Sequence, residues 1–469
     1  MNSDNMWLTV MGLIIIISIV GLLIAKKINP VVGMTIIPCL GAMILGYSVT
    51  DLVGFFAKGL DQVINVVIMF IFAIIFFGIM NDSGLFKPLV KRLILMTRGN
   101  VVIVCAMTAL IGTIAQLDGA GAVTFLLSIP ALLPLYKALN MNKYLLILLL
   151  ALSAAIMNMV PWGGPMARVA AVLKAKSVNE LWYGLIPIQI IGFILVMLFA
   201  VYLGFKEQKR IKKAIERNEL PQTQDIDVHK LVEVYERDQD VRFPVKGRAR
   251  TKSWIKWVNT ALTLAVILSM LINIAPPEFA FMIGVSLALV INFKSVDEQM
   301  ERLRAHAPNA LMMAAVIIAA GMFLGVLNET GMLKAIATNL IKVIPAEVGP
   351  YLHIIVGLLG VPLDLLTSTD AYYFAVLPIV EQTAGQFGVP SVSTAYSMVI
   401  GNIIGTFVSP FSPALWLAIG LAEANMGTYI KYAFFWIWGF AIVMLVIAML
   451  MGIVTKKKKK NRNYGHVAK

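Results

Sequence analysis

The sequence is poor in charge and in the side chains that build metal or redox sites. Only 14% of its 469 residues are charged, against roughly 25% in soluble domains. It has 2 cysteines and 4 histidines. Cys39 and Cys105 lie inside apolar stretches, where we expect small core residues rather than a disulfide, a metal ligand or a nucleophile. The sequence contains neither a His/Cys ligand cluster nor catalytic-triad spacing. It therefore predicts neither an enzyme nor a resident cofactor.

Apolar residues dominate instead. Hydrophobic residues make up 59% of the chain, and the mean hydropathy is +0.84. Apolar runs of about 18 or more residues recur along the chain, and a soluble fold has no way to bury so many. The first run is followed by Lys26 and Lys27 and lacks a cleavage site, so we expect it to be retained as a helix. The sequence predicts an all-α, multi-pass protein of the cell membrane with spans near 7–25, 30–47, 62–80, 181–204, 255–274, 279–293, 307–327 and 429–453.

The net charge of +14 lies mainly in loops beside apolar spans. This is the positive-inside pattern of membrane proteins, so we expect contact with membrane lipid and no nucleic-acid partner. The polar stretch 205–254 is predicted to be a cytoplasmic linker, in which 206–218 can form a solvated helix and the rest is poorly ordered. The basic tail, 455–469, is predicted to bind lipid headgroups.

The two halves of the chain carry matching strings in the same order. FGIMNDSGLFK at 77–87 matches LGVLNETGMLK at 324–334. An acid in an apolar stretch follows in each half, in LDGAGAVT and LDLLTSTD, and then an asparagine before a Pro/Gly break, in NMVPWGGP and NIIGTFVSPFSP. Three matches in order predict an internal repeat, with a first repeat over 1–204 and a second over 255–454.

Four apolar stretches are interrupted by polar, Gly or Pro clusters. Backbone at membrane depth must be hydrogen-bonded internally, so such breaks survive only inside protein or along a cavity. We predict re-entrant hairpins at 101–136 and 350–385, and broken transmembrane helices at 144–175 and 393–421. Each repeat then has five spans, and this odd number inverts the second repeat and places the lysine-rich tail outside. The tail then disagrees with the positive-inside rule, so either one span is miscounted or the tail is an exception to that rule. Paired interrupted helices in inverted repeats are typical of secondary transporters, whose site they form.

Carboxylates inside the bilayer are expensive and are functional candidates by default. We predict Asp118, Asp364 and Asp370 at the hairpin tips, where they can carry a proton, pair with a cation or bind a metal. The structural alternatives are a salt bridge or a cap on a half-helix.

Residues at the breaks are candidates for binding an anion. Arg168 is the only basic residue of the segment 158–173, and its guanidinium suits a carboxylate. The alternative is a pair with Asp118 or another hairpin acid, and both hold if a substrate displaces the acid. Asn158 and Asn402 open the breaks, where freed N–H groups attract anions. The glycines Gly163 and Gly164 permit close backbone approach. Six hydroxyls complete the set, either as ligands or as partners of the broken backbone: Thr367, Ser368, Thr369, Thr406, Ser409 and Ser412.

Other polar and aromatic residues are expected to have structural roles. Trp162 and Tyr372 line the site or pack beside it. Asp82 and Glu329, at the ends of two spans, are expected to be interfacial caps, and His306 is expected in a loop.

These strings resemble the citrate–divalent metal:proton symporter family, CitMHS, within the ion transporter superfamily. The similarity is strongest in ALSAAIMNMVPWGGPMARVAAVL at 151–173 and QLDGAGAVTFL at 116–126, and it extends over nearly the whole chain except the linker and tail. One departure is Met166, where the family usually has a small or hydroxyl residue.

The resemblance implies proton-coupled symport of citrate complexed with a divalent cation of the Mg or Ca class. It also implies a homodimer with an elevator-like transport domain. The charges agree with this, because a bound divalent cation reduces trivalent citrate to a net charge of about −1, which one arginine and half-helix dipoles can hold. The alternatives are a transporter of another organic anion, such as gluconate or a dicarboxylate, and an ion/proton antiporter.

Overall fold

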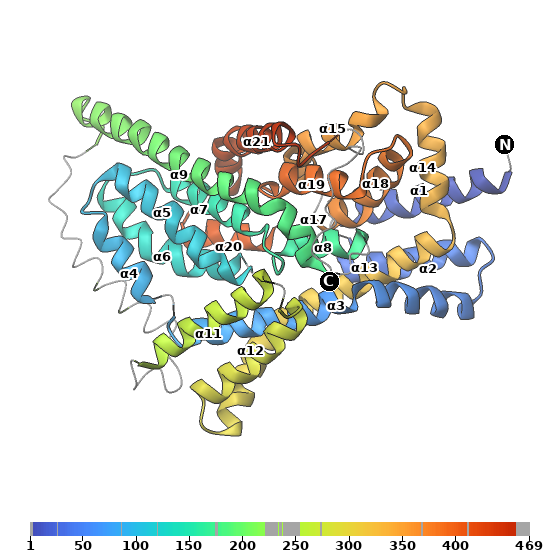
Figure 1. Ribbon diagram of the computed structural model, residues 1–469. Coiled ribbons are helices and arrows are strands. Elements are labelled where there is room, and N and C mark those ends of the chain that lie inside the picture. The colour runs from blue at the N-terminus through green and yellow to red at the C-terminus, as the bar shows by residue number, and fades with distance from the viewer. Residues whose placement is uncertain are drawn as a thin grey trace.

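The structure is a computed structural model that describes residues 3–25, 27–85, 87–119, 121–173, 177–220, 233, 237, 254–272, 274–366, 369–409 and 412–455. All regular secondary structure in these residues is helical (Figure 1).

The described part of the first half contains ten helical elements, which are named here in chain order. They are α1 (Ser3–Ile24), α2 (Pro30–Ile44), α3 (Val49–Asp82), α4 (Lys87–Met96), α5 (Val101–Ala115), η1 (Gln116–Asp118), α6 (Ala122–Ala138), α7 (Lys143–Met157), α8 (Gly164–Leu173) and α9 (Val178–Glu216).

The second half begins after the linker. Its elements are α11 (Trp254–Leu271), α12 (Pro277–Asn292), α13 (Val296–Glu329), α14 (Met332–Val343), η3 (Gly349–Tyr351), α15 (Leu352–Leu358), α16 (Gly360–Leu366), α17 (Thr369–Ala371), η4 (Tyr372–Val376), α18 (Leu377–Gln386), α19 (Ser391–Asn402), η5 (Gly405–Phe407), α20 (Pro413–Leu421) and α21 (Met426–Leu450). From α3 and α13 onward the two halves show the same order: a long helix, an amphipathic helix, a helical hairpin, an interrupted helix and a closing helix.

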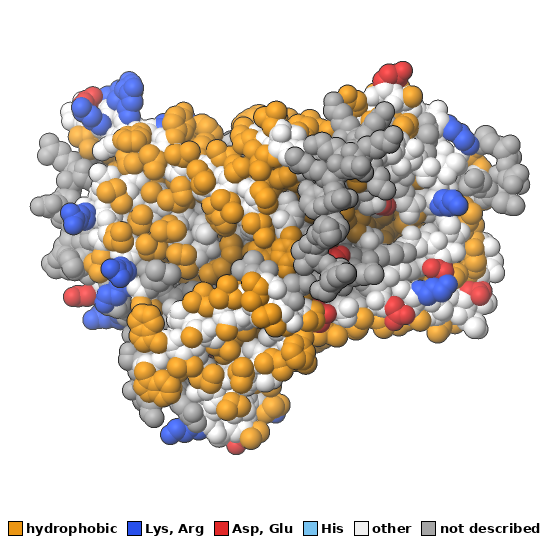
Figure 2. All heavy atoms as spheres, viewed as in Figure 1, with side chains coloured by type: hydrophobic (Ala, Val, Ile, Leu, Met, Phe, Trp, Pro, Cys, Tyr) orange, Lys and Arg blue, Asp and Glu red, His pale blue; other side chains and the backbone are white. Residues whose placement is uncertain are grey.

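The surface is that of a membrane protein. By length and composition, α3, α9, α13 and α21 are able to cross a bilayer, and shorter apolar helices accompany them among the described residues. Large apolar side chains such as Trp257 and Leu198 are exposed, and Figure 2 shows apolar side chains over much of the visible face, with Lys and Arg toward its edges. An apolar surface of this extent is stable only against lipid.

The helices α3 and α13 pack against each other over most of their lengths and run side by side in Figure 1. Small residues allow this close crossing. A Cβ atom on Gly59 would lie 2.0 Å from the carbonyl oxygen of Gly321, and one on Gly325 would lie 2.2 Å from that of Phe55. Small residues at a helix crossing let the backbones touch, which is how helices associate in membranes without a hydrophobic driving force.

Ion pairs close both ends of this crossing and correct two expectations. Asp82 accepts from Arg302 NH1 at 3.3 Å and lies 2.9 Å from His306 Nε2, and Glu329 pairs with Lys58 at 2.5 Å. Asp82 and Glu329 are therefore partners in ion pairs rather than simple interfacial caps. His306 lies inside α13 and not in a loop, because α13 begins at Val296, well before its apolar part.

Contacts in the loops fix which helix ends lie together. Asn142 N, before α7, donates to Glu207 Oε1 of α9 at 2.6 Å. Lys137 at the end of α6 pairs with Glu423, after α20, at 2.9 Å and thereby lowers the pKa of that carboxyl. We call this the Glu207 end of the molecule. The predicted solvated helix near 206–218 is the continuation of α9 at this end.

The last described residues, up to Thr455, lie at the opposite end. The helix α21 follows Asn425, whose N–H donates to the Tyr144 hydroxyl at the Glu207 end at 3.4 Å. After α21, Thr455 N donates to Ser393 Oγ, at the start of α19, at 2.7 Å. The helices that close the two halves, α9 and α21, thus end on opposite sides; we call the second side the Thr455 end.

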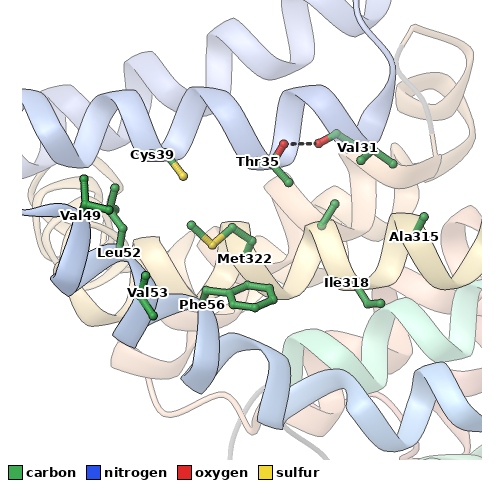
Figure 3. A pocket seen from close by; sticks show the side chains of 11 residues that line it. Val31, Thr35, Cys39, Val49, Leu52, Val53, Phe56, Ala315, Ile318 and Met322 are labelled. Carbon is green, nitrogen blue, oxygen red and sulfur yellow. Dashed lines mark hydrogen bonds between the residues drawn. The ribbon is translucent and has the colours of Figure 1, made fainter.

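An open groove of about 590 Å³ lies between α2, α3 and α13 (Figure 3). Its lining is apolar, with Met322, Phe56 and Leu52 among the side chains. The Thr35 hydroxyl is already used, because it donates to the Val31 carbonyl at 2.7 Å. This groove offers nothing to a charged solute, so the site of interest lies elsewhere.

Candidate functional site

The first interrupted helix breaks between α7 and α8. The α7 helix ends at Met157, and residues 158–163 form turns before α8 starts at Gly164. The turn folds tightly on itself, because a Cβ atom on Gly163 would lie only 2.1 Å from the carbonyl oxygen of Asn158. This close approach explains the glycine at 163. Asn158 is the C-cap of α7, and its side chain turns toward the hairpin.

The hairpin formed by α5, η1 and α6 holds this break. Gln116 Nε2 donates to Asn158 Oδ1 at 2.7 Å, and the Thr124 hydroxyl donates to Gln116 Oε1 at 2.5 Å. Trp162 Nε1 donates to the Leu117 carbonyl at 2.7 Å. Gln116, Thr124 and Asn158 are all buried. We call them the neutral triad.

The second break lies between α19 and α20 and is held by the second hairpin. Asn402, the last residue of α19, donates from Nδ2 to the Gly360 carbonyl at 3.2 Å. The fully buried carboxyl of Asp364 interacts with the side chains of Asn402 and Thr369. The Thr369 hydroxyl lies 3.4 Å from Asp364 Oδ2 and 3.2 Å from the Thr406 hydroxyl. We call Asp364, Thr369 and Asn402 the acidic triad.

The two triads have the same composition except at one position. Each joins the asparagine at the end of a half-helix to a hydroxyl across the hairpin tip, through one residue of the hairpin. That residue is Gln116 in the first half and Asp364 in the second. The difference replaces a neutral amide with a group that can bind or lose a proton.

One ion pair connects the two halves at the site. Arg168 Nε of α8 donates to Asp370 Oδ1 of α17 at 2.7 Å, and the two side chains are 12% and 18% exposed. The structural alternative for Arg168, a pair with a hairpin acid, is thus present in the structure. Nearby, the rings of Phe125 and Phe407 meet edge to face with centroids 5.6 Å apart, so the first hairpin also contacts the second break.

The other predicted site residues have varied positions. Ser412 is the N-cap of α20, and its Oγ accepts from the backbone N–H of Leu415 at 3.4 Å. Its hydroxyl is thus a partner of the backbone at the break. Ser409 is buried within the break. A Cβ atom on Gly164 would lie 2.9 Å from Arg168 NH1, which puts that glycine beside the guanidinium. Thr367 and Ser368 lie outside the described residues, as does the side chain of Asp118 at the end of η1.

Two residues of the neutral triad were not predicted. Gln116 and Thr124 flank the predicted acid Asp118, but amides and hydroxyls in an apolar stretch carry a weaker signal than a charge. Trp162 packs, as one alternative held, with its ring stacked on Phe77 at a centroid distance of 5.8 Å. Among the described residues, no group of three or more His, Cys, Asp or Glu side chains is arranged to hold a metal ion.

Comparison with known proteins decides the family. Residues 6–401 match the CitMHS family model, described as citrate transporter. The chain belongs to the CitMHS family. Membership makes it a multi-pass membrane transporter rather than an enzyme.

Relatives in Bacillus subtilis (strain 168) match over nearly their whole length. A citrate transporter is 33% identical over 96% of this chain and 100% of its own. An Mg(2+)/citrate complex secondary transporter is 30% identical over 96% of this chain and 99% of its own.

Two solved structures share the fold at low identity. The Alcanivorax borkumensis YdaH transporter has a TM-score of 0.57 at 16% identity and covers 88% of this chain and 89% of its own. Neisseria gonorrhoeae MtrF has a TM-score of 0.55 at 15% identity and covers 87% of this chain and 83% of its own. The CitMHS chain is therefore an all-helical membrane protein that resembles these transporters in fold.

Proposed function

We propose that this CitMHS protein is a secondary active transporter that carries citrate, complexed with a divalent cation of the Mg or Ca class, into the cell together with protons. The two Bacillus relatives support the substrate, since one is named for citrate and the other for its magnesium complex.

The observation that carries this proposal is the Arg168–Asp370 pair. It places one guanidinium at the junction of the first interrupted helix and the second hairpin, and it is still partly accessible. A guanidinium binds a carboxylate through two parallel hydrogen bonds. Asp370 then occupies the position of a substrate carboxylate while the site is empty of citrate, and the substrate displaces it.

A single arginine suits a partly neutralised substrate. Citrate complexed with a divalent cation has a net charge of about −1. Moving one negative charge inward against a negative-inside potential costs about 2.3 kcal/mol per 100 mV. Symport of two or more protons makes the net charge moved positive, so that the potential favours uptake.

We further propose that 1–204 and 255–454 are inverted repeats, with re-entrant hairpins and broken helices, that move in an elevator-like manner. The matching order of elements and the ends of α9 and α21 on opposite sides support this arrangement. The basic residues near the Glu207 end make that end cytoplasmic under the positive-inside rule.

The test is uptake of labelled citrate by proteoliposomes over a panel of divalent cations, with and without an inward proton gradient. We expect uptake to need both a cation and the gradient. Uptake that survives a chelator would remove the metal from the proposal. Competition by gluconate or dicarboxylates stronger than that by metal–citrate would move the substrate to another organic anion.

A further inference from the structure

The acidic triad has two oxygen atoms without hydrogen-bond donors. Asp364 Oδ1 and Asn402 Oδ1 are both buried, and neither has a hydrogen-bond partner among the residues that the structure describes. Two such acceptors in one buried triad are costly, because each has lost its hydration without a replacement. The triad therefore lacks a hydrogen-bond donor or a cation for these two oxygens.

Among the described residues, the positively charged group that acts on Asp364 is Arg168, and it does not donate to these two oxygens. The titratable groups that interact with Asp364 are Arg168 from α8, Asp370 from α17, and the tyrosines Tyr372 and Tyr373 of the π-helical turn η4. The Nε of Arg168 is committed to Asp370. The backbone of η5 closes in from the other side, since a Cβ atom on Gly405 would lie 3.2 Å from Asp364 Oδ2.

In the neutral triad, by contrast, the corresponding side chains have hydrogen-bond partners. There the amide of Gln116 both donates, to Asn158, and accepts, from Thr124. Neither Gln116 nor Asn158 has an atom among the buried unpartnered ones. An amide needs no added proton to do this, whereas a carboxylate does, because only its protonated form can donate.

We propose that Asp364 is the residue that takes up and releases a coupling proton, and that Gln116 is its permanently neutral counterpart in the first half. This inference rests on the proposed function and assigns its proton to a residue. The proton forms an O–H bond at Asp364 Oδ1 when the site faces the outer solution and leaves that oxygen for inner water after transport; no other bond changes. The two halves therefore share one architecture, but only the second half exchanges protons.

The experiment uses the purified full-length protein in proteoliposomes, with labelled citrate and Mg²⁺. Asp364→Asn imitates the protonated carboxyl. We expect it to keep exchange of internal against external citrate, which needs no net proton movement, and to lose accumulation driven by an inward pH gradient. The pH dependence of exchange should flatten as well. Asp297→Asn, the same change at an exposed carboxylate in the first turn of α13, should behave as the unchanged protein.

Several outcomes would overturn the assignment. Undiminished accumulation by Asp364→Asn would show that another group carries the proton. Loss of exchange together with accumulation, in a variant that still elutes as a single folded species, would show that the carboxylate is required for binding and not for protons. Accumulation that follows an imposed Na⁺ gradient, and is lost in Asp364→Asn, would make the triad a sodium site.

A second variant covers the case in which Asp364→Asn does not fold. Asn402→Ala removes the amide beside Asp364 but leaves the carboxyl, so we expect a shifted pH profile of exchange with coupling retained. An unshifted profile would count against the triad. The parent proposal fails in a different way, because the unchanged protein would then show no citrate exchange at any pH.

Discussion

Arg168 and Asp370 are 202 residues apart in the chain, yet Nε and Oδ1 lie 2.7 Å apart. The pair joins an interrupted helix of one half to the hairpin of the other. Under the proposed function, a substrate carboxylate would compete with Asp370 for this guanidinium, and binding of the substrate would then release this link between the halves.

Variants of Arg168 and Asp370 can distinguish a role in citrate binding from a role in stability. Arg168→Ala should abolish citrate binding and also destabilise the protein, because removing one partner of a largely buried pair typically costs about 3–5 kcal/mol. The double variant Arg168→Ala/Asp370→Asn removes the uncompensated charge. It should recover most of the thermal stability in detergent while citrate binding stays absent by calorimetry. Recovery of both would show that Arg168 is purely structural.

The neutral triad is expected to stabilise the tip of the first hairpin. Gln116→Ala leaves Asn158 Oδ1 and the Thr124 hydroxyl without their buried partner. An unsatisfied buried polar group costs about 1–3 kcal/mol, so the melting temperature should fall. Thr113→Ala, which removes a hydrogen bond from the Thr113 hydroxyl to the backbone carbonyl oxygen of Ala109 within α5, is the matched control and should cost less. Equal losses would mean that the triad adds nothing specific.

Glycine at the crossing of α3 and α13 is a steric requirement. Gly59→Ala would put a methyl group 2.0 Å from the Gly321 carbonyl oxygen, whereas Gly54, also in α3, has nothing within 4 Å of the same position. Overpacking of this kind costs about 1–3 kcal/mol or more. We expect Gly59→Ala to lower the yield of folded protein and Gly54→Ala to leave it unchanged, as measured by size-exclusion chromatography. Equal yields would contradict the close crossing.

The two ends of the same crossing should differ in energy. Asp82 faces Arg302, whose side chain is 6% exposed, while Lys58 and Glu329 are 63% and 26% exposed. Exposed pairs contribute about 0–1 kcal/mol. Asp82→Ala instead removes an acidic partner from both Arg302, which keeps its pair with Glu301, and His306, and breaking a buried pair costs several kcal/mol. Asp82→Ala should therefore destabilise the protein far more than Glu329→Ala in thermal unfolding. A reversed order would contradict the burial of this cluster.

Cysteine labelling tests the sides of the membrane. In a protein whose native cysteines are replaced by alanine, Thr455→Cys should react with an impermeant maleimide on intact cells, and Glu219→Cys only after permeabilisation. The reason is that α9 and α21 end on opposite sides. Labelling of both positions from the same side would contradict the arrangement.

Much of the helical framework was predictable from apolar runs, because the bilayer imposes length and hydropathy on any helix that crosses it. The predicted spans near 62–80 and 307–327 coincide with the apolar parts of α3 and α13, but both helices extend to 34 residues. The extension of α13 is polar and charged, so hydropathy does not detect it, which is why the sequence predicts a loop at His306. The extension of α3 is mostly apolar but is interrupted by Asp51, Lys58 and Asp61.

The contacts of the site were harder to predict. The matching strings align Asp118 with Asp364, yet in the described contacts Gln116 has the place that Asp364 has in the second half, and the side chain of Asp118 lies outside the described residues. The partner of Arg168 depends on how the halves dock, and three acids were candidates. Sequence located the breaks; only the folded chain shows which side chains meet across them.

The crossing of α3 and α13 also bears on how the molecule is assembled. The halves meet through backbone contacts at Gly59 and Gly325, through ion pairs at both ends and through Arg168–Asp370. The peptide link between them adds little to this set of contacts. Two separately encoded polypeptides, cut within the linker, should therefore find each other in the membrane and complement one another as a split transporter.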